Sequence, residues 1–207
     1  SAKLLQPYLK VARKIGSLLG QLDPVDVTEL RVTCSGQAGE LGVTPIAHAA
    51  LAGYLEQHLE EPVNPISAPY EAKERGIALV EVREETGTGY ASTIRVTIKG
   101  NKGIHTATGA IGNDQLAHLV GLDGYTLDAV MQGHVVLMRN LDRPGVIGAV
   151  GTVLGRRNIN VSRMQVGLDE STGQALALYN VNSELTNDAL DELRGIENVS
   201  TVFCVEL

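Results

Sequence analysis

The sequence predicts an α+β protein with two domains, and three observations carry that prediction. Apolar residues recur at helical spacing near the start, and runs of alternating apolar and polar residues follow. From Val135 onward the elements read strand, helix, strand, strand, helix, strand. The first part is typical of an antiparallel sheet covered by helices on one side. The second part has the βαββαβ order of a ferredoxin-like domain.

The first predicted helix spans residues 4–22, where apolar side chains recur every three or four residues. Pro7 falls early in this helix, where a missing N–H is tolerated, and Asp23-Pro24 ends it. The apolar face of the helix needs a cover. The chain begins with Ser1, which fits a piece cut from a longer polypeptide, so a second subunit is one candidate for that cover.

The rest of the first domain is predicted from turn residues and apolar patterns. Thr44 is the expected N-cap of a helix with Pro45 at its first position, and Gly76 is the expected C-cap of another. Hairpin turns are expected at Gly100-Asn101 and Asp123-Gly124. The predicted elements are a strand at 30–34, a turn at 35–39, helices at 44–59 and 67–75, and strands at 77–84, 91–99 and 102–111.

The second domain opens with a predicted strand at residues 135–138. Asp142 is the expected N-cap of the helix that follows, with Pro144 at its first position, and the helix runs to about Arg157. Thr186 is the expected cap of a second helix. The remaining elements are strands at 160–168, 175–181 and 199–205 and the helix at 187–194.

Three glycines, Gly148, Gly151 and Gly155, fall on one face of the first of these two helices. Each glycine inside a helix costs about 1 kcal/mol relative to alanine, so the pattern indicates a close approach of another backbone or group. One interpretation is packing of the helix on the sheet within the domain. The other is contact with a partner or a small ligand. The spacing does not match the G-x-G-x-x-G fingerprint of dinucleotide binding.

Composition and charge exclude several classes of partner. The net charge of −7 argues against binding to nucleic acid or to an acidic membrane surface. No apolar run approaches the roughly 20 residues that span a bilayer, and no signal peptide is visible. Cys34 and Cys204 are far apart and outside any C-x-x-C context, so we expect reduced thiols and a cytoplasmic protein.

Two stretches carry a resemblance to a known family. Leu141-Asp-Arg-Pro-Gly-Val-Ile-Gly, then Leu154-Gly-x-x-x-Ile-Asn-Val and Met164-Gln-Val-Gly, resemble an ACT domain, above all the one that ends bacterial D-3-phosphoglycerate dehydrogenases. The run VNPISAPYEAKERGI, residues 63–77, resembles the intervening or ASB (allosteric substrate binding) domain of the longer dehydrogenases, with extra residues around Ile66-Ser67. The resemblance implies a linker helix from a catalytic half at 1–22, an ASB domain at 23–133 and an ACT domain at 134–207.

The resemblance also implies an effector site for L-serine or a related small amino acid. The family's serine-binding positions fall here on Asn140, Asp142 and Asn160, with groups drawn from both sides of an ACT–ACT interface. From the residues alone, a helix start offers free N–H groups to a carboxylate, and Asp142 can accept an ammonium. The expected N–H donors are those of Gly145, Val146, Ile147 and Gly148. The alternative makes Asp142 only an N-cap and Asn160 only a turn residue.

Other candidate sites are weaker. Some relatives hold an anion in the ASB domain, and the basic residues available here are Lys99 and Lys102 beside a turn. The five histidines show no metal-ligand spacing, so no metal site is expected. We also find no Ser–His–acid arrangement and no paired catalytic carboxylates, so no active site is expected in this chain.

The resulting expectation is the regulatory region of a D-3-phosphoglycerate dehydrogenase. The resemblance implies that the parent enzyme uses NAD in the first committed step of L-serine biosynthesis, that this chain itself holds no cofactor, and that it forms a homodimer or homotetramer through its ACT domains. Two alternatives stay open. One is the ASB–ACT subunit of an iron–sulfur L-serine dehydratase, although a Gly-Pro-Ser-Ser-Ser-His-type segment and clustered cysteines are missing. The other is a stand-alone amino-acid sensor.

Overall fold

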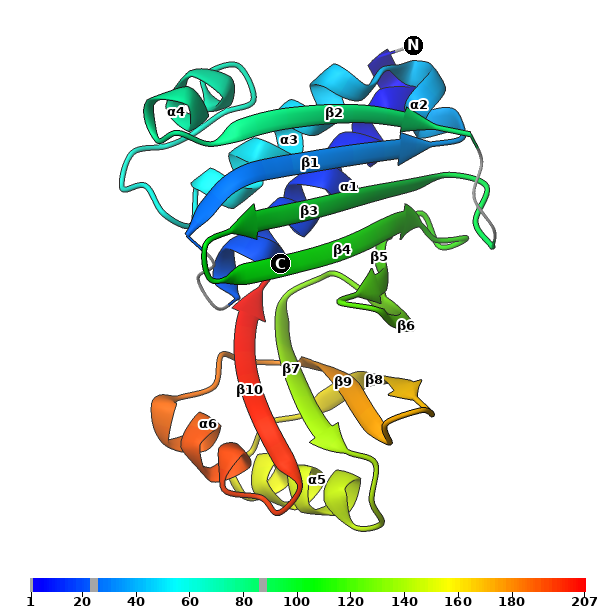
Figure 1. The fold of residues 1–207 in the computed structure, drawn as a ribbon. Helices are drawn as coiled ribbons and strands as arrows, with labels where there is room; N and C mark the ends of the chain where they lie inside the picture. The colour runs from blue at the N-terminus through cyan, green and yellow to red at the C-terminus, as the bar shows by residue number, and fades with distance from the viewer. Residues whose placement is uncertain (1, 23–25, 86–88) are drawn as a thin grey trace. The chain divides into compact units, whose positions relative to one another are not determined.

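The computed structural model describes residues 2–22, 26–85 and 89–207. It confirms the α+β class, with two sheets in two compact units, residues 1–124 and 125–207, which are described separately (Figure 1). The proposed division of the parent chain at residues 22 and 133 stays a prediction.

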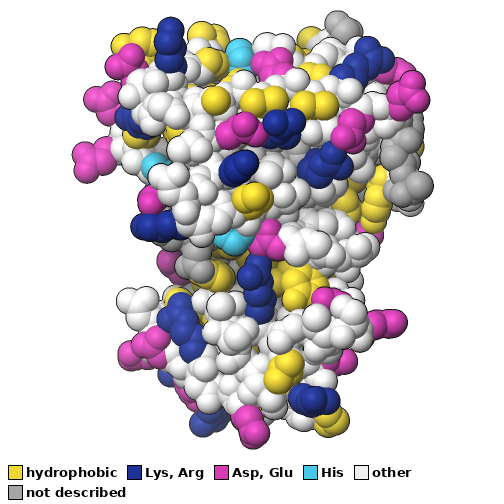
Figure 2. Space-filling view, viewed as in Figure 1, with side chains coloured by type: hydrophobic (Ala, Val, Ile, Leu, Met, Phe, Trp, Pro, Cys, Tyr) yellow, Lys and Arg dark blue, Asp and Glu magenta, His cyan; other side chains and the backbone are white. Residues whose placement is uncertain are grey.

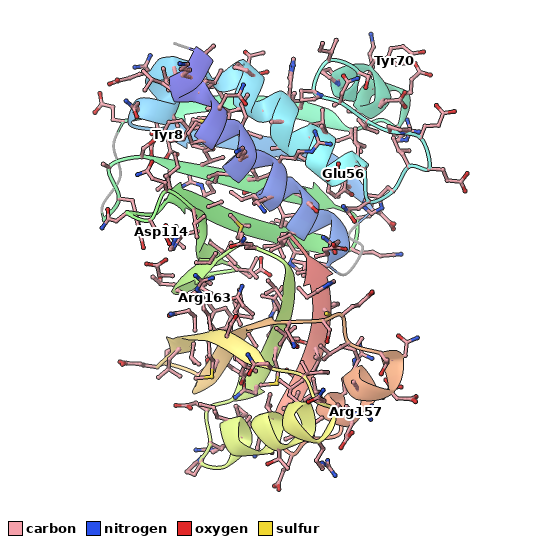
Figure 3. All side chains as sticks on the ribbon, turned by 180° about the vertical axis from the view of Figure 1, so that it is seen from behind. Tyr8, Glu56, Tyr70, Asp114, Arg157 and Arg163 are labelled. Carbon is pink, nitrogen blue, oxygen red and sulfur yellow. The ribbon has the colours of Figure 1, made fainter. Side chains whose placement is uncertain are left out.

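The first unit is one sheet with helices on one face. Its strand order is β2-β1-β3-β4-β5, in which β1 and β2 are parallel and the β1–β3, β3–β4 and β4–β5 pairs are antiparallel. The helices α1 and α3 lie across the sheet (Figure 3). The elements are α1 (Ala2–Gln21), β1 (Val27–Ser35), α2 (Gln37–Leu41), α3 (Val43–Leu55), α4 (Ala68–Glu74), β2 (Ala78–Glu84), β3 (Thr93–Gly100), β4 (Gly103–Ile111) and β5 (Ala117–Leu122).

The apolar face of α1 is buried against other elements of the first unit. The expectation that a second subunit would bury it is therefore wrong. Its residues Val11 and Ile15 lie against Gly109 of β4. Two glycines let α1 and α3 approach closely, because a Cβ on Gly16 would lie 1.9 Å from the carbonyl oxygen of Ala50, and one on Gly53 would lie 2.1 Å from that of Arg13. Glycine is thus required at both crossings.

Three local predictions in this unit are wrong. A turn was expected at residues 35–39, but the chain turns only at Gly36, whose φ is 60°, and the short helix α2 begins at the next residue. The N-cap of α3 is Gly42, and the hydroxyl of Thr44 instead donates to Oε2 of Glu81 (2.7 Å). The β3–β4 hairpin pairs Gly100 with Gly103, so its turn lies one residue later than expected.

The second unit has the predicted βαββαβ order after a leading strand. Its sheet order is β10-β7-β9-β8, with all three pairings antiparallel. Thr186 caps α6 as predicted, its hydroxyl accepting from the N–H of Ala189 (3.3 Å). The elements are β6 (Tyr125–Val130), β7 (His134–Leu141), α5 (Val146–Arg156), β8 (Val161–Asp169), β9 (Gln174–Val181), α6 (Asn187–Arg194) and β10 (Val199–Glu206).

The core of the second unit lies between α5, α6 and one face of the sheet. Alternate residues of β7 and β9 point into it, as the period of a strand requires. The inward residues of α5 follow helical spacing. The buried members include Val136, Met138, Ala177 and Tyr179 from the strands, Val146, Val150, Val153 and Leu154 from α5, and Ala189 and Leu193 from α6.

Candidate functional site

The segment between β7 and α5 is held by backbone hydrogen bonds on both sides. The N–H of Leu141 donates to the carbonyl of Asn198 (2.8 Å), and the N–H of Asp142 donates to the carbonyl of Gly173 (2.8 Å). Gly145 then adopts φ 94°, ψ −17°, a left-handed conformation that follows Pro144 in a tight turn. This geometry fixes where the chain enters α5.

Asp142 does not cap the helix, so that reading of its role is wrong. The helix α5 begins at Val146 after Gly145, with no side-chain cap, and Pro144 lies in the turn before it. The Asp142 side chain is exposed, and within the described residues its carboxylate has no hydrogen-bond partner. A free carboxylate beside a helix start is available to a cation.

Asn140 is the second polar side chain of this corner, and it is buried. It lies on β7 with 6% of its surface exposed, two residues from Met138 on the same face of the sheet. Its Nδ2 donates to the carbonyl of Leu141 (2.8 Å), but its Oδ1 is buried without a partner among the described residues. Leaving such an acceptor unsatisfied costs about 1–3 kcal/mol, so a donor from a ligand would be stabilising there.

The start of α5 supplies N–H donors. The first bond of helical spacing runs from the N–H of Ala149 to the carbonyl of Gly145 (2.9 Å). The N–H groups of Ile147 and Gly148 precede it, and they are the free donors that a helix start offers an anion. Acceptors for an ammonium and donors for a carboxylate therefore lie at one corner of the unit.

The glycine face of α5 points away from the sheet. Gly148, Gly151 and Gly155 are exposed, and a Cβ on any of them would meet nothing within 4 Å. The interpretation as helix–sheet packing within the domain is therefore wrong. The inward side of α5 is formed by its valines and Leu154. The glycines leave a smooth, open surface on the outer side.

An exposed apolar surface runs along β8, the last strand of the sheet. Met164, Val166 and Leu168 are 40%, 41% and 46% exposed, and Ile147 of α5 is 52% exposed. The three β8 residues pair with Tyr179, Ala177 and Ala175 on the helix side of the sheet. In the described part of this unit, no strand pairs with the outer edge of β8. The residue spacing 164, 166, 168 could have signalled this surface from the sequence.

Asn160 lies at the other end of α5 from Asp142. It is exposed, its N–H donates to Oδ1 of Asn182 (3.0 Å), and its carbonyl accepts from the N–H of Asn182 (3.2 Å). Eleven residues of α5 separate the two ends by about 16 Å. Within one chain, then, Asn140, Asp142 and residues 145–148 come together and Asn160 does not join them.

The candidate anion residues have negative neighbours. Nζ of Lys102 lies 3.1 Å from Oδ2 of Asp26, and Lys99 faces Glu29 across the β1–β3 pair. Positive and negative side chains alternate over this face of the first unit (Figure 2). The anion site stays a prediction, and these carboxylates weaken it.

Other chemistries find little support in the described residues. Across 2–22, 26–85 and 89–207, no group of three or more His, Cys, Asp or Glu side chains could hold a metal ion. Burial, with a smaller effect from Glu81, raises the pKa of the Cys34 thiol to about 12, far from that of a reactive thiolate. No helix in the part of the chain that the structure describes is long and apolar enough to cross a membrane.

Comparison with known proteins matches both units. Residues 4–123 match the D-3-phosphoglycerate dehydrogenase intervening domain, and residues 134–198 match the ACT domain. D-3-phosphoglycerate dehydrogenases from Synechocystis sp. and Bacillus subtilis are each 31% identical over 98% of this chain. The protein of that name from Archaeoglobus fulgidus is 32% identical over 99%. The chain spans only 37%, 39% and 39% of these relatives' lengths. The intervening-domain match alone covers more than half of the 207 residues, so the chain belongs to the D-3-phosphoglycerate dehydrogenase family, as an intervening domain followed by an ACT domain.

Proposed function

We propose that this chain is the regulatory region of a D-3-phosphoglycerate dehydrogenase and that it binds L-serine at an interface between two ACT domains. In this proposal serine acts as a feedback inhibitor of the first committed step of its own synthesis. The observation that carries the proposal is the buried, unsatisfied Oδ1 of Asn140, which lies two residues from the free carboxylate of Asp142.

A free amino acid is a zwitterion, and this corner of the second unit suits both of its charges. The N–H groups of Ile147 and Gly148 can receive the carboxylate, because the positive end of the helix dipole favours an anion there. The carboxylate of Asp142 and Oδ1 of Asn140 can accept from the ammonium. Hydrogen bonds to charged groups contribute about 1.5–3 kcal/mol, so a few of them hold a small ligand.

A single chain leaves this site open to solvent on the side of the β8 edge. Pairing of that edge with the same edge of a second chain would bury Met164, Val166 and Leu168. It would also place residues of the second chain beside the start of α5. Strands that pair about a two-fold axis run antiparallel, so the start of the partner's β8 comes beside the end of this one. The partner subunit's Asn160 immediately precedes its β8, which is why we assign it to the same site.

The parent enzyme would oxidise 3-phosphoglycerate with NAD in the cytoplasm. Its nucleotide-binding and catalytic portions would lie outside this chain, which spans 37% and 39% of the length of two relatives. Serine that bridges two ACT domains would favour one arrangement of subunits over another. The size of that response is limited by the difference in serine affinity between the arrangements.

Isothermal titration of L-serine into the 207-residue chain tests the proposal. We expect saturable binding that Asp142→Ala weakens by about 1.5–3 kcal/mol, the range for a hydrogen bond to a charged group. Asp188→Ala is the matched control, because it removes an exposed carboxylate at the start of α6 and should leave the affinity unchanged. Absence of binding, or equal affinity in the Asp142 and Asp188 variants, would reject the assigned role.

A further inference from the structure

The strand β2 forms the outer edge of the sheet in the first unit (Figure 1). Its seven residues pair on one side with β1, and in the described part of this unit no strand pairs with the other side. None of the seven side chains is buried, whereas Leu30, Val32 and Cys34 of β1 are completely buried. The N–H and C=O groups along this edge are therefore open to a further strand.

Two charges of opposite sign lie on the helix side of β2. Glu81 is the register partner of Val32, and Arg83 is the register partner of Cys34, so both point to the side of the sheet that holds the core. The hydroxyl of Thr44 in α3 donates to Oε2 of Glu81 (2.7 Å), which places Glu81 on that side. An edge strand thus carries a carboxylate and a guanidinium where the neighbouring strand carries core residues.

Arg83 is an unpaired cation. Its side chain passes Gly39 of α2, where a Cβ would lie 3.2 Å from Cγ and 3.6 Å from Nε of Arg83. Arg83 is exposed, and among the described residues its guanidinium forms no ion pair and no hydrogen bond. The second oxygen of Glu81, Oε1, has only Nε2 of His48 near it, at 4.0 Å. Both charges can therefore receive a partner from outside the chain.

We infer that the outer edge of β2 pairs with the same edge of a second copy of this chain, antiparallel and with Val82 on the two-fold axis. In this register Glu81 lies opposite the partner subunit's Arg83, and Arg83 lies opposite the partner subunit's Glu81. One contact thus forms the same ion pair twice. The contact lies in the first unit, so it does not rest on the proposed function.

Symmetry and charge together select this register. A two-fold axis between antiparallel strands is perpendicular to the sheet, so the helices of both copies lie on one face and a single residue falls on the axis. With Glu81 or Arg83 on the axis, like charges face each other. With Val80 on the axis, neither charge faces one of the opposite sign. Of these registers, only the one centred on Val82 pairs both charges, and cross-strand pairs of opposite charge stabilise a sheet.

The pattern of signs favours a second copy over an unrelated strand. Charged residues on an edge strand can also prevent pairing, as they do where all of them have the same sign. Glu81 and Arg83 instead have opposite signs, and they lie one residue to either side of Val82. On the outer face of the sheet, Val82 would meet the partner subunit's Val82 and cover surface that one chain leaves half-exposed. The edge of β2 is therefore self-complementary.

The contact is small, because it consists of one seven-residue strand from each copy. Interfaces that bury less than about 1,200 Å² are typical of weak and transient association. We therefore expect copies that exchange rapidly, and covalent trapping is the sensitive measurement of such a contact.

Disulfide trapping in the 207-residue chain tests the register. Opposite residues of antiparallel strands have Cβ atoms about 4.5–5.5 Å apart, close to the roughly 3.5–4.5 Å that a disulfide needs. Val82→Cys, on the axis, should therefore give a covalent dimer on mild oxidation. Val80→Cys is the matched control, because the two copies of residue 80 lie about 13 Å apart along the strands and should link far more slowly. The unaltered chain, with Cys34 and Cys204, gives the background.

Charge reversal provides a second measurement. It is made in the Val166→Lys variant, in which like charges oppose the β8 contact of the proposed function. Arg83→Glu should raise the dissociation constant for self-association by about 2- to 30-fold, the range for two exposed ion pairs. Adding Glu81→Arg should restore the affinity, because the two pairs form again with their signs exchanged. Sedimentation equilibrium measures both effects.

The outcomes separate this inference from the proposed function. Linking of Val80→Cys as fast as or faster than Val82→Cys would overturn the inference. So would a double variant that associates more weakly than Arg83→Glu alone, or a Val166→Lys chain that stays monomeric at roughly 1 mM. Linking through Val82→Cys in a chain that binds no serine would reject the proposed function alone.

Discussion

The backbone N–H of Asp142 donates to the carbonyl of Gly173 across 2.8 Å, which joins the start of α5 to the turn between β8 and β9. The loop that carries the free carboxylate is therefore tied to the end of the edge strand. In the proposed function, a partner strand beside β8 would lie next to this turn. A ligand at the helix start and that partner would then be connected through this one hydrogen bond.

Gly145 should be intolerant of a side chain for reasons of backbone conformation alone. Its φ of 94° is left-handed, and a Cβ there would meet nothing within 4 Å. Gly145→Ala should lower the free energy of unfolding by about 1–2 kcal/mol, measured by urea denaturation. Gly151→Ala is the control within α5, and it should raise stability by about 0.5–1 kcal/mol. Equal effects of the two variants would contradict this account.

The crossing of α1 and α3 should be sensitive to a single methyl group. A Cβ on Gly53 would lie 2.1 Å from the carbonyl oxygen of Arg13, and a backbone atom cannot move aside cheaply. We expect Gly53→Ala to destabilise the first unit by about 1–3 kcal/mol, as overpacked cores do. Thermal unfolding measures the loss. A variant as stable as the unaltered chain would show that the two helices can separate freely.

The sequence predicted the elements well because each carries a local signal. The Asp123-Gly124 turn, with φ values of 49° and 87°, and the Thr186 cap are local effects of this kind. Thr44 is not the cap because α3 already begins at Val43 after Gly42, and its hydroxyl donates to Glu81, 37 residues away. The elements that bury the apolar face of α1 could not be predicted from the residues of α1, since they are α3 and β4.

The candidate site was predicted in part. The pattern around Asp142 and Gly145 correctly placed the candidate site at the start of α5. The N-cap position, however, is occupied by the left-handed Gly145 and not by Asp142. Periodicity placed three glycines on one face of α5 without telling which way that face points. Only the packing of the helix valines decides it. The buried Oδ1 of Asn140 likewise depends on neighbours distant in sequence.

The β4–β5 turn should show a dependence on acid pH. Oδ1 of Asp114 accepts the N–H of Leu116 (3.0 Å), and this bond, together with His118 (Nε2 at 2.9 Å), lowers the carboxyl pKa below its usual 3.8. A lowered folded-state pKa gives stability above pH 3.8 that is lost as the pH falls further. The stability difference between the unaltered chain and Asp114→Asn should therefore shrink below that pH. A constant difference from pH 2 to 6 would contradict this.

Cys34 should resist alkylation and destabilise the fold at alkaline pH. Burial raises its thiol pKa from 9.0 to about 12, so the thiol form is favoured in the folded chain. A raised pKa gives stability below pH 9 that declines between pH 9 and 12, by up to roughly 1.4 kcal/mol per pH unit. Cys34→Ala should flatten that decline in urea unfolding. Rapid labelling of native Cys34 by iodoacetamide at pH 9 would refute the burial argument.

Mixing two variants that each bind L-serine weakly tests most directly whether the serine site is shared between chains. Asp142→Ala and Asn160→Ala should each bind L-serine weakly alone. In an equimolar mixture, heterodimers keep one complete site, so tight binding should return at roughly a quarter of all sites, as random pairing of subunits requires. Calorimetric titration of the mixture reports this directly. If the mixture binds no more tightly than either variant alone, the residues do not meet across a dimer and the account fails.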